Sequence, residues 1–327
     1  MSAAIKVLTK PTGASRRQHL TRVGSNGQHD EKQIGHPPPQ PQTTLDKPRE
    51  ELGLPHLKSG YEAKPFKLIH DRDWNIVSTE PASETNFFVE GHSALSVVSA
   101  IGTLGSGKST LLNKLARRNV FITHNVGQLD LNHQTRGVEV YSTHHRILVD
   151  SQPVLSSSVL GRFISGLSRS QFADLTEPLT CCQMIDLQLV TFLMATSDYV
   201  VIVCDWLIDV HLLKLLSSAI MMIGEPNLRA KLLLYCENSL DITSDSFRKL
   251  VESFLGRNRI DGYFDSCETL YSHIAAYSRE KLDLYSVDDR KFTGKNWLES
   301  CSKLWNVTIK NSSMFTDYAS QLSETGV

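Results

Sequence analysis

The chain has 327 residues, of which 40% are hydrophobic and 21% are charged, and its formal net charge is −1. This composition is that of a folded globular protein. The net charge near zero excludes a protein whose overall positive charge binds it to polyanions such as nucleic acids. No apolar run is expected to approach the roughly 20 residues of a membrane span, so no membrane partner is predicted. The six cysteines form no C-x-x-C pair, which favours reduced thiols and a cytoplasmic location, with the nucleus left open.

Residues 1–62 are polar and rich in Gln, Gly, His and Pro. They contain no periodic apolar face that would offset the entropy lost on ordering, so they are predicted to be a disordered tail. Whether this tail docks a partner is left open. Residues 63–327 are predicted to form one domain, which begins with strands at 65–69 and 86–89.

A glycine-rich stretch follows an apolar strand predicted at 94–101 and precedes a helix predicted at 110–118. It matches the phosphate-binding pattern G-x-x-x-x-G-K-[ST], in which backbone N–H groups cradle phosphates at a helix N-terminus. Lys108 is expected to neutralise the β- and γ-phosphates, and Ser109 to ligate Mg²⁺. The predicted nucleotide ligands here are Gly102, Gly105, Ser106, Gly107, Lys108, Ser109 and Thr110.

A hairpin is predicted next, with strands at 138–143 and 146–150 after a loop at 120–137. Thr135 in this loop and Asp150 at the strand end are predicted to hold Mg²⁺ together with Ser109. The arrangement fits the second and third strands of a GTPase-type domain. Pro153 departs from it, because proline has no N–H for a γ-phosphate. Val154 stands where many GTPases carry a water-orienting glutamine, and Gln152 is interpreted as a solvated loop residue.

The remaining chain alternates between strands and helices. After an irregular segment at 151–180, strands are predicted at 199–204, at 231–236 and once after residue 262, and helices at 184–196, 210–223, 247–255 and 297–322. Such alternation predicts an α/β fold with a mostly parallel sheet and helices on both faces. The fold class is a P-loop NTPase, G-domain-like. Cys181 and Cys182 are expected in the core, and Trp206 in a strand-end turn as a packed indole.

A base-reading segment is expected after the strand at 231–236. Asn238-Ser239-Leu240-Asp241 keeps the Asn and Asp of the GTPase motif N-K-x-D but lacks its Lys. Asn238 and Asp241 are therefore predicted to contact the base, whereas Asp241 as a plain helix cap is the alternative. Guanine and adenine stay open, so the predicted cofactors are a purine nucleotide (GTP/GDP or ATP) and Mg²⁺.

Several stretches together resemble the SMG nine family of nonsense-mediated mRNA decay factors. They are Thr135-Arg136-Gly137, Asp150-Ser151-Gln152-Pro153-Val154-Leu155-Ser156, Met184-Ile185-Asp186-Leu187-Gln188, the run from Val200 to Asp209, and Lys295-Asn296-Trp297 followed by Trp305. The resemblance implies a G-domain-like fold and a heterodimer with a second G-domain-like protein, SMG eight. It also implies assembly onto a phosphatidylinositol-kinase-like protein kinase that phosphorylates the decay helicase UPF one. Pro153, unusual for a GTPase, is part of the family pattern.

The function expected from these features is that of a nucleotide-binding scaffold and regulatory subunit of this kinase complex. The chain is not expected to be an enzyme beyond very weak NTPase activity, and no direct reading of nucleic acid is evident. One alternative is an active large, dynamin-related GTPase, which Thr135-Arg136-Gly137 suggests. The other is a P-loop nucleotide kinase, although no arginine-bearing lid segment is evident.

Overall fold

The computed structural model describes residues 64–77, 96–123, 132–143, 145–170, 172, 177–206, 208–224, 228, 230–237, 242–277 and 293–325. The predicted tail at 1–62 and the predicted strand at 86–89 lie outside these residues. The other predicted strands are present, and two helices that the sequence did not indicate are added to them.

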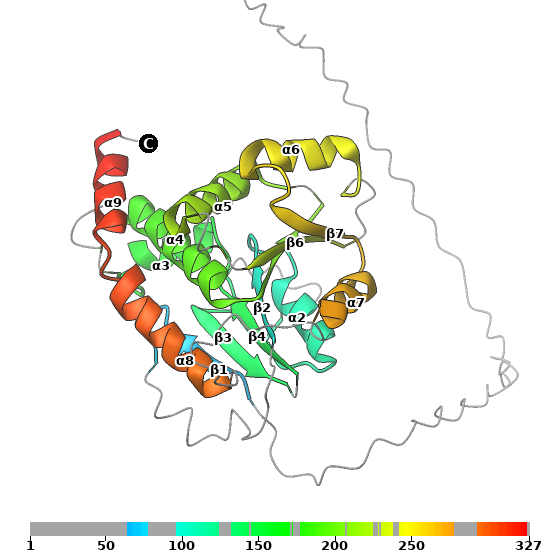
Figure 1. Ribbon diagram of the computed structural model, residues 1–327. Coiled ribbons are helices and arrows are strands. Elements are labelled where there is room, and N and C mark those ends of the chain that lie inside the picture. Colours follow the sequence, from blue (N-terminus) through cyan, green and yellow to red (C-terminus); the bar gives the residue numbers. More distant parts are fainter. Residues whose placement is uncertain are drawn as a thin grey trace, which may run out of the picture. The chain divides into compact units, whose positions relative to one another are not determined.

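A seven-stranded sheet is the centre of the described part of the chain (Figure 1). Its strands are β1 (Phe66–Ile69), β2 (Ser96–Ile101), β3 (Val138–Ser142), β4 (Arg146–Ser151), β5 (Tyr199–Cys204), β6 (Lys231–Cys236) and β7 (Ile260–Phe264). They lie in the order β1-β3-β4-β2-β5-β6-β7, and only β3 runs antiparallel to its neighbours β1 and β4. The predicted mostly parallel α/β sheet is thus confirmed.

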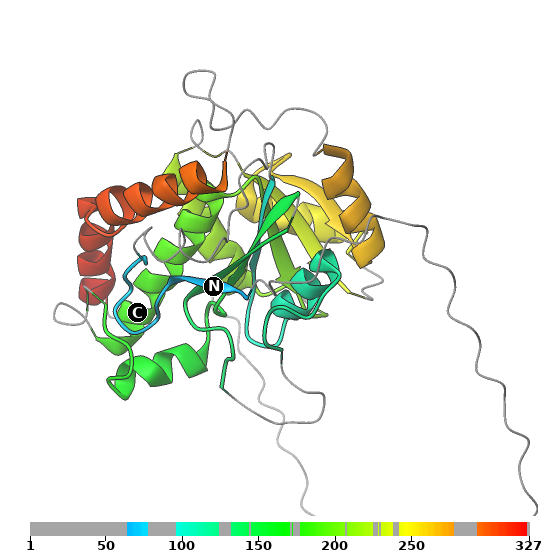
Figure 2. The same cartoon turned by 90° about the horizontal axis from the view of Figure 1, so that it is seen from below.

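Helices cover both faces of this sheet, as predicted. They are α2 (Lys108–Ala116), α3 (Ser157–Ile164), α4 (Pro178–Thr196), α5 (Val210–Ile223), α6 (Asp245–Leu255), α7 (Cys267–Tyr277), α8 (Gly294–Lys303), the π-helix η2 (Leu304–Ile309) and α9 (Ser313–Thr325). Residues of α2 and α7 form one core with the sheet, and residues of the other helices form a larger core on the opposite face. Figure 2 shows α8 and α9 on the side of the sheet away from α2 and α7.

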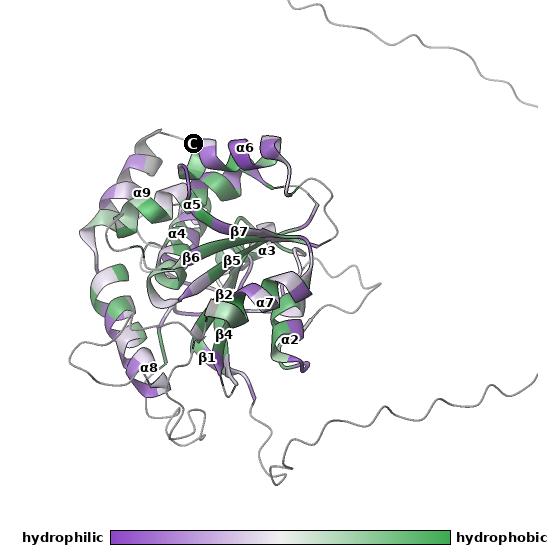
Figure 3. Ribbon diagram, turned by 45° about the vertical axis from the view of Figure 1, so that its right-hand side comes forward, coloured by the Kyte–Doolittle hydropathy of each residue, from purple (hydrophilic) through white to green (hydrophobic). Residues whose placement is uncertain are grey.

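The central strands are buried on both faces, which explains their nearly continuous apolar sequence. In β2, Val97 and Ile101 pack into the larger core, whereas Val98 and Ala100 pack into the smaller one. Figure 3 shows the same pattern as strands coloured mainly hydrophobic at the centre. Successive side chains of a strand point to opposite faces, so one short apolar run supplies both cores.

The neighbouring strands β2 and β4 lead into helices on opposite faces of the sheet. β2 is followed by α2 on the side of the smaller core, and β4 is followed by α3 and α4 on the side of the larger core. In open α/β sheets, ligands bind in the crevice outside the carboxyl ends of such a strand pair. The residues that follow β2 and β4 are those that the sequence singled out.

The segment at 151–180 was predicted to be irregular, but the structure contains helices there. It contains α3, whose buried residues Val159 and Phe163 are four positions apart, and the first turn of α4, which begins at Pro178 rather than at residue 184. Serine at residues 156–158 suggests a loop, but serine is also favoured where helices begin. Proline is likewise favoured in the first helical turn, so both signals marked helix starts.

The end of the chain also differs from its prediction. The sequence indicated one helix at 297–322, and the structure has α8, η2 and α9 in its place. The Lys310 N–H donates to the Trp305 carbonyl five residues earlier, which is the hydrogen bond of a π-helical turn. Helix α7 was not predicted either, because its first residues follow the short β7 after only two residues.

Helix α4 corrects the expectation about apolar runs. It has 19 residues with mean hydropathy 1.4, so it is long and apolar enough to cross a membrane by length and composition. In the structure, 83% of that stretch is buried inside the fold. Helix α4 packs against α3, α5, η2 and α9, so it serves as the core helix of the larger layer.

Candidate functional site

The glycine loop, residues 102–109, turns from β2 directly into α2. Gly107 is the N-cap of α2 and has φ +89°, a left-handed backbone that residues with a side chain rarely adopt. The first turn of α2 contains no acidic residue. The loop therefore presents a helix N-terminus, with its partial positive charge, to whatever anion enters the crevice.

Lys108 reaches back over this loop. Its Nζ donates to the carbonyl oxygens of Gly102 at 3.0 Å and Thr103 at 2.9 Å, and the side chain is buried. Burial lowers the pKa of Lys108 to about 8, and the charge of Asp150 opposes this shift. The ammonium group is thus poorly solvated, and a bound anion would supply the negative charge that it lacks.

Ser109, Thr135 and Asp150 meet beneath the loop, although they come from α2, from the loop before β3 and from β4. The hydroxyls of Ser109 and Thr135 donate to Oδ2 of Asp150 at 2.7 and 2.8 Å, and the two hydroxyl oxygens are 3.2 Å apart. Burial raises the pKa of Asp150 to about 6, against the opposing effects of the Ser109 hydrogen bond and the Lys108 charge. The three residues predicted to hold Mg²⁺ are therefore adjacent.

This cluster has the chemistry of a magnesium site. Oδ1 of Asp150 is buried and has no hydrogen-bond partner among the described residues, so one carboxylate oxygen is available to a cation. One carboxylate and two hydroxyls are hard oxygen donors, and Mg²⁺ commonly takes one or two carboxylates together with waters and phosphate oxygens. No group of three or more His, Cys, Asp or Glu side chains suited to a metal occurs in the described part of the chain.

The residues after β4 differ from their prediction. Gln152, interpreted as a solvated loop residue, is 1% exposed, and its Oε1 accepts a hydrogen bond from the Gly137 N–H at 3.1 Å. Val154 is also fully buried, and its N–H donates to the Gly102 carbonyl at 3.2 Å. Neither side chain faces solvent, so neither is placed to orient a water molecule from the surface.

The base-reading segment lies outside the described residues, because these exclude both Asn238 and Asp241. The structure does place an ion pair beside it, between Lys114 on α2 and Glu237 directly before Asn238. A hollow of about 460 Å³ adjoins this pair along one face of α2. Its lining residues are Thr110, Asn113, Lys114, Arg117, Arg118, Asn119 and Thr123. Of the predicted nucleotide ligands, Thr110 thus faces this hollow.

Trp206 corrects a further prediction. The indole was expected to pack in the turn after β5, and 74% of the residue is exposed. Asp209 caps α5 by accepting the His211 N–H at 2.8 Å, so the turn is fixed by a helix cap rather than by the indole. Cys181 and Cys182 are buried, as expected.

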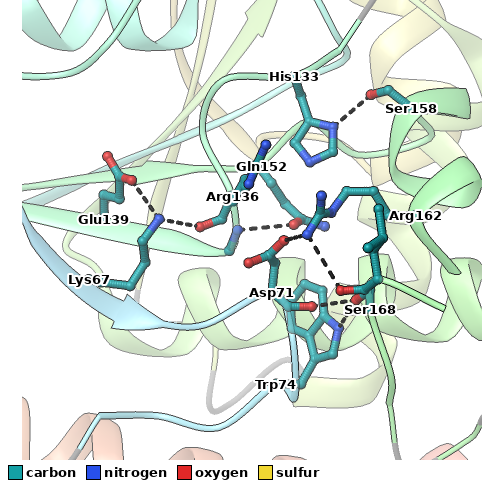
Figure 4. A network of polar contacts seen from close by, with 12 residues as sticks. Lys67, Asp71, Trp74, His133, Arg136, Glu139, Gln152, Ser158, Arg162 and Ser168 are labelled. Atoms are coloured by element: carbon teal, nitrogen blue, oxygen red, sulfur yellow. Dashed lines mark hydrogen bonds and ion pairs between the residues drawn. The ribbon is translucent and has the colours of Figure 1, made fainter. Parts of the chain in front are cut away.

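Sequence reasoning missed the polar network around the site (Figure 4). His133 is buried and pairs through Nδ1 with the Ser158 hydroxyl at 2.7 Å, and burial lowers the pKa of His133 to about 4. Asp186, buried in α4, accepts the Leu155 N–H at 2.7 Å. An acidic residue inside an otherwise apolar helix is the signal that could have identified Asp186.

Curated proteins give partial matches to this chain. It is 30% identical over 169 residues to the nonsense-mediated mRNA decay factor SMG9 of Salmo salar. The matched region covers 48% of this chain and 32% of that protein. The SMG9 of Xenopus laevis is 31% identical over 136 residues, covering 38% and 27%. That of Caenorhabditis elegans is 35% identical over 98 residues, covering 24% and 25%. The chain thus spans about a quarter to a third of the length of these relatives.

Two further comparisons are less informative. No protein-family model matches the chain. Crystal structures of two mutation variants of SsGBP overlap 62% of this chain and 60% of theirs, with TM-scores of 0.32 and 0.31 and identities of 15% and 17%. Overlaps of this size do not establish a common fold.

Proposed function

We propose, on the premise that its curated homologues support assignment of this chain to the SMG9 family, that it acts in nonsense-mediated mRNA decay. Its role there is that of a nucleotide-binding scaffold and regulatory subunit of a protein kinase complex. The domain is G-domain-like and of the P-loop class, and it binds a purine nucleotide with Mg²⁺. It hydrolyses this nucleotide slowly or not at all.

One observation carries the nucleotide-binding part of the proposal. Ser109, Thr135 and Asp150 converge within hydrogen-bond distance below a loop whose Lys108 is buried with its Nζ on loop carbonyls. These side chains come from three separate elements at the carboxyl edge of the sheet. A chance glycine-rich turn would not require a buried lysine and a buried carboxylate at adjoining positions, since each is costly without a ligand or partner.

In this proposal each residue has a distinct task. Lys108 leaves the loop carbonyls and neutralises the β- and γ-phosphates, and the N–H groups of the glycine loop donate to the phosphate oxygens. Ser109 and Thr135 hold Mg²⁺ through their hydroxyls, and Asp150 holds it directly or through water. The metal neutralises phosphate charge. Thr110 and the hollow on α2 adjoin the ribose and base, which Asn238 and Asp241 contact.

Slow hydrolysis follows from the residues after β4. Pro153 has no N–H to offer a γ-phosphate, and Val154 and Gln152 are buried. Transfer to water needs an oriented water molecule and a stabilised γ-phosphate. Pro153 supplies no N–H to the phosphate, and the apolar Val154 side chain cannot orient water. We therefore propose that the bound nucleotide has a structural role and that its hydrolysis does not drive a conformational change.

The partners and location are part of the same proposal. They are a second G-domain-like protein of the SMG eight type, in a heterodimer, and the phosphatidylinositol-kinase-like kinase of the complex. The location is the cytoplasm, with the nucleus as a further possibility. The resemblance in sequence supports these partners, and the match to the Salmo salar protein covers 48% of this chain.

Co-purification from cells tests the whole proposal. The full chain is isolated under gentle conditions, bound proteins are identified by mass spectrometry, and nucleotide is extracted and identified by chromatography. Recovery of a large protein kinase and of a purine nucleotide in near-equal amount to the chain is expected. Lys108→Ala should lose the nucleotide, whereas Lys249→Ala, an exposed lysine on α6, should keep it. A chain that carries neither kinase nor nucleotide would contradict the proposal.

A further inference from the structure

We infer that Gln152 and Asp186 are positioning residues that fix two chain segments beside the phosphate site. Because these segments do not move, the site binds nucleoside diphosphate and nucleoside triphosphate with almost equal affinity. The two segments are the Thr135 loop, residues 132–137, and the Gln152 segment, residues 152–155. This inference rests on the proposed function, since it concerns the terminal phosphate of the same nucleotide. The site would then respond to whether a nucleotide is bound and not to whether that nucleotide carries two or three phosphates.

The two segments are joined by a reciprocal pair of hydrogen bonds. The Gln152 N–H donates to the Gly137 carbonyl at 2.8 Å, and the Gly137 N–H donates to Oε1 of Gln152 at 3.1 Å. Gln152 is 1% exposed, so water does not compete for these bonds. Both backbone groups of Gly137 are thus bonded to one residue of the other segment.

Gly137 also fixes the end of the Thr135 loop against β1. Its φ is +69°, and a Cβ at this position would lie 2.0 Å from the carbonyl oxygen of Ile69. Only glycine permits this close approach. Nearby, Lys67 on β1 donates from Nζ to the Arg136 carbonyl at 2.7 Å. The end of the loop is therefore seated on one side by β1 and on the other by Gln152.

The beginning of the Thr135 loop is held by α3. His133 is 4% exposed and pairs through Nδ1 with the Ser158 hydroxyl at 2.7 Å. Ser158 also lies 2.9 Å from the hydroxyl of Ser156, so this contact belongs to the start of α3. Thr135 lies between two anchored ends, and its hydroxyl donates to Asp150. The loop is thus placed by contacts within the chain.

The Gln152 segment has no backbone donor left for a ligand. Gln152 donates to Gly137, Val154 donates to Gly102 at 3.2 Å, and Leu155 donates to Oδ2 of Asp186 at 2.7 Å. Pro153 has no N–H. In switch GTPases a backbone N–H in this segment meets the γ-phosphate, and here every such group is used or missing. A terminal phosphate therefore gains no backbone N–H contact from these residues.

Asp186 holds the far end of the segment in a costly conformation. Leu155 has φ +53°, which a residue with a side chain rarely adopts, and its N–H points at a carboxylate that is 1% exposed. Asp186 lies on α4, which is buried in the larger core. The segment is thus tied to a helix buried in the larger core and not only to the loops near the ligand.

The consequence for ligand preference is thermodynamic. A ligand shifts a conformational equilibrium only by its differential interaction with the two states. If both segments keep one structure, the γ-phosphate gains only its contacts with Lys108, Mg²⁺ and the glycine loop, which the β-phosphate already makes. We therefore expect dissociation constants for diphosphate and triphosphate within about fivefold, below the usual range of allosteric coupling.

The test combines affinity with hydrogen exchange on the full chain. Binding of GDP, GTPγS, ADP and ATPγS with Mg²⁺ is measured by calorimetry, and amide exchange of peptides covering 132–137 and 150–156 is followed with no nucleotide and with each. The variants are Gln152→Ala and Asp186→Ala. Gln188→Ala is the matched control, because Gln188 is equally buried on α4 and bonds to the Ile309 carbonyl instead.

For the wild type we expect slow exchange in both segments in every state, and a triphosphate preference below about fivefold. Gln152→Ala and Asp186→Ala should speed exchange in both segments and raise the preference above about tenfold, because a loosened segment can be ordered by the γ-phosphate. Gln188→Ala should change neither quantity. Fast exchange in the nucleotide-free wild type, or a tenfold triphosphate preference, would overturn this inference alone. Failure of all four nucleotides to bind would overturn the proposed function as well.

Discussion

The indole N–H of Trp305 donates to the carbonyl oxygen of Trp74 at 2.9 Å, a bond between residues 231 positions apart. Both tryptophans are 1% exposed or less. The Trp305 ring also meets Phe192 of α4 edge to face, with centroids 5.2 Å apart. The π-helix near the end of the chain thus closes over the turn after β1 and over the core helix, which joins the two ends of the domain.

This contact predicts a graded loss of stability. Trp305→Phe removes the donor but keeps most of the ring. We expect a loss of about 1 to 3 kcal/mol, because the Trp74 carbonyl loses its shorter hydrogen bond and keeps only Lys310 Nζ at 3.5 Å. Trp305→Ala leaves a cavity and should cost about 3 to 5 kcal/mol. Denaturant unfolding followed by circular dichroism measures both. Trp206→Phe, at an exposed tryptophan, is the control and should stay within about 0.5 kcal/mol. Equal losses at the two tryptophans would contradict this account.

Much of the fold could be predicted because local signals were unambiguous. The strands β2, β5 and β6 are nearly continuous apolar runs, and the Gly102 to Ser109 pattern stands between a strand and a helix, as predicted. Ser109, Thr135 and Asp150 were placed together from motif order alone, and the structure brings them into contact. Their roles with Mg²⁺ and nucleotide remain predictions.

The errors concern residues whose surroundings come from distant parts of the chain. A polar Gln152 in a loop suggests a surface residue, but in the structure it is buried and bonded to Gly137. The large aromatic Trp206 suggests a core residue, but in the structure it is exposed. At η2, Trp305 contacts Trp74, a residue 231 positions away that no local pattern encodes. Sequence periodicity finds elements, whereas burial of a single side chain depends on tertiary packing.

Asp186 predicts a pH-dependent stability. Burial raises the pKa of its carboxyl from 3.8 to about 7, against the opposing Leu155 hydrogen bond. Because the folded-state pKa lies above the unfolded one, the stabilising contribution is complete below about pH 4 and is lost as pH rises through about 7. Asp186→Asn keeps an oxygen acceptor and cannot ionise. It should gain on the order of 2 kcal/mol relative to wild type between about pH 5 and pH 8.

Urea unfolding of both proteins across this pH range gives the difference directly. Asp150 and Asp198, whose pKa values burial also raises to about 6, are present in both proteins and cancel in the comparison. Asp205→Asn, at an exposed carboxyl, controls for the loss of one charge. A stability difference between Asp186→Asn and wild type that does not vary with pH would show that this carboxyl keeps an ordinary pKa.

Lys108 predicts a link between nucleotide and stability. A ligand that binds only the folded state stabilises it by about 2.7 kcal/mol at a hundredfold excess over its dissociation constant. Thermal melts with and without Mg²⁺ and purine nucleotide should show this gain for the wild type and for Lys249→Ala. Lys108→Ala should lose it, because the phosphates lose their cation. A wild type that gains nothing from any purine nucleotide would mean that the loop no longer binds one.

The last prediction concerns hydrolysis and separates the scaffold from the active large GTPase that Thr135-Arg136-Gly137 suggested. In the proposed function, Lys108, Ser109, Thr135 and Asp150 hold the β-phosphate and Mg²⁺, so binding is expected to be firm. Pro153 and the buried Val154 offer nothing that positions water or contacts the γ-phosphate. We expect a turnover no faster than that of an unassisted small GTPase, on the order of 10⁻⁴ per second.

Phosphate release under single-turnover conditions measures this rate, for the chain alone and with its partner subunit. The informative variant is Pro153→Gly, which restores a backbone N–H at the position where GTPases have one. Because the buried, apolar Val154 still cannot orient the attacking water, this single donor should raise the rate by less than about tenfold. A wild-type rate near 1 per second that Lys108→Ala abolishes would favour the active GTPase. A large gain from Pro153→Gly alone would instead show that the missing N–H, and not the fixed segment, limits hydrolysis.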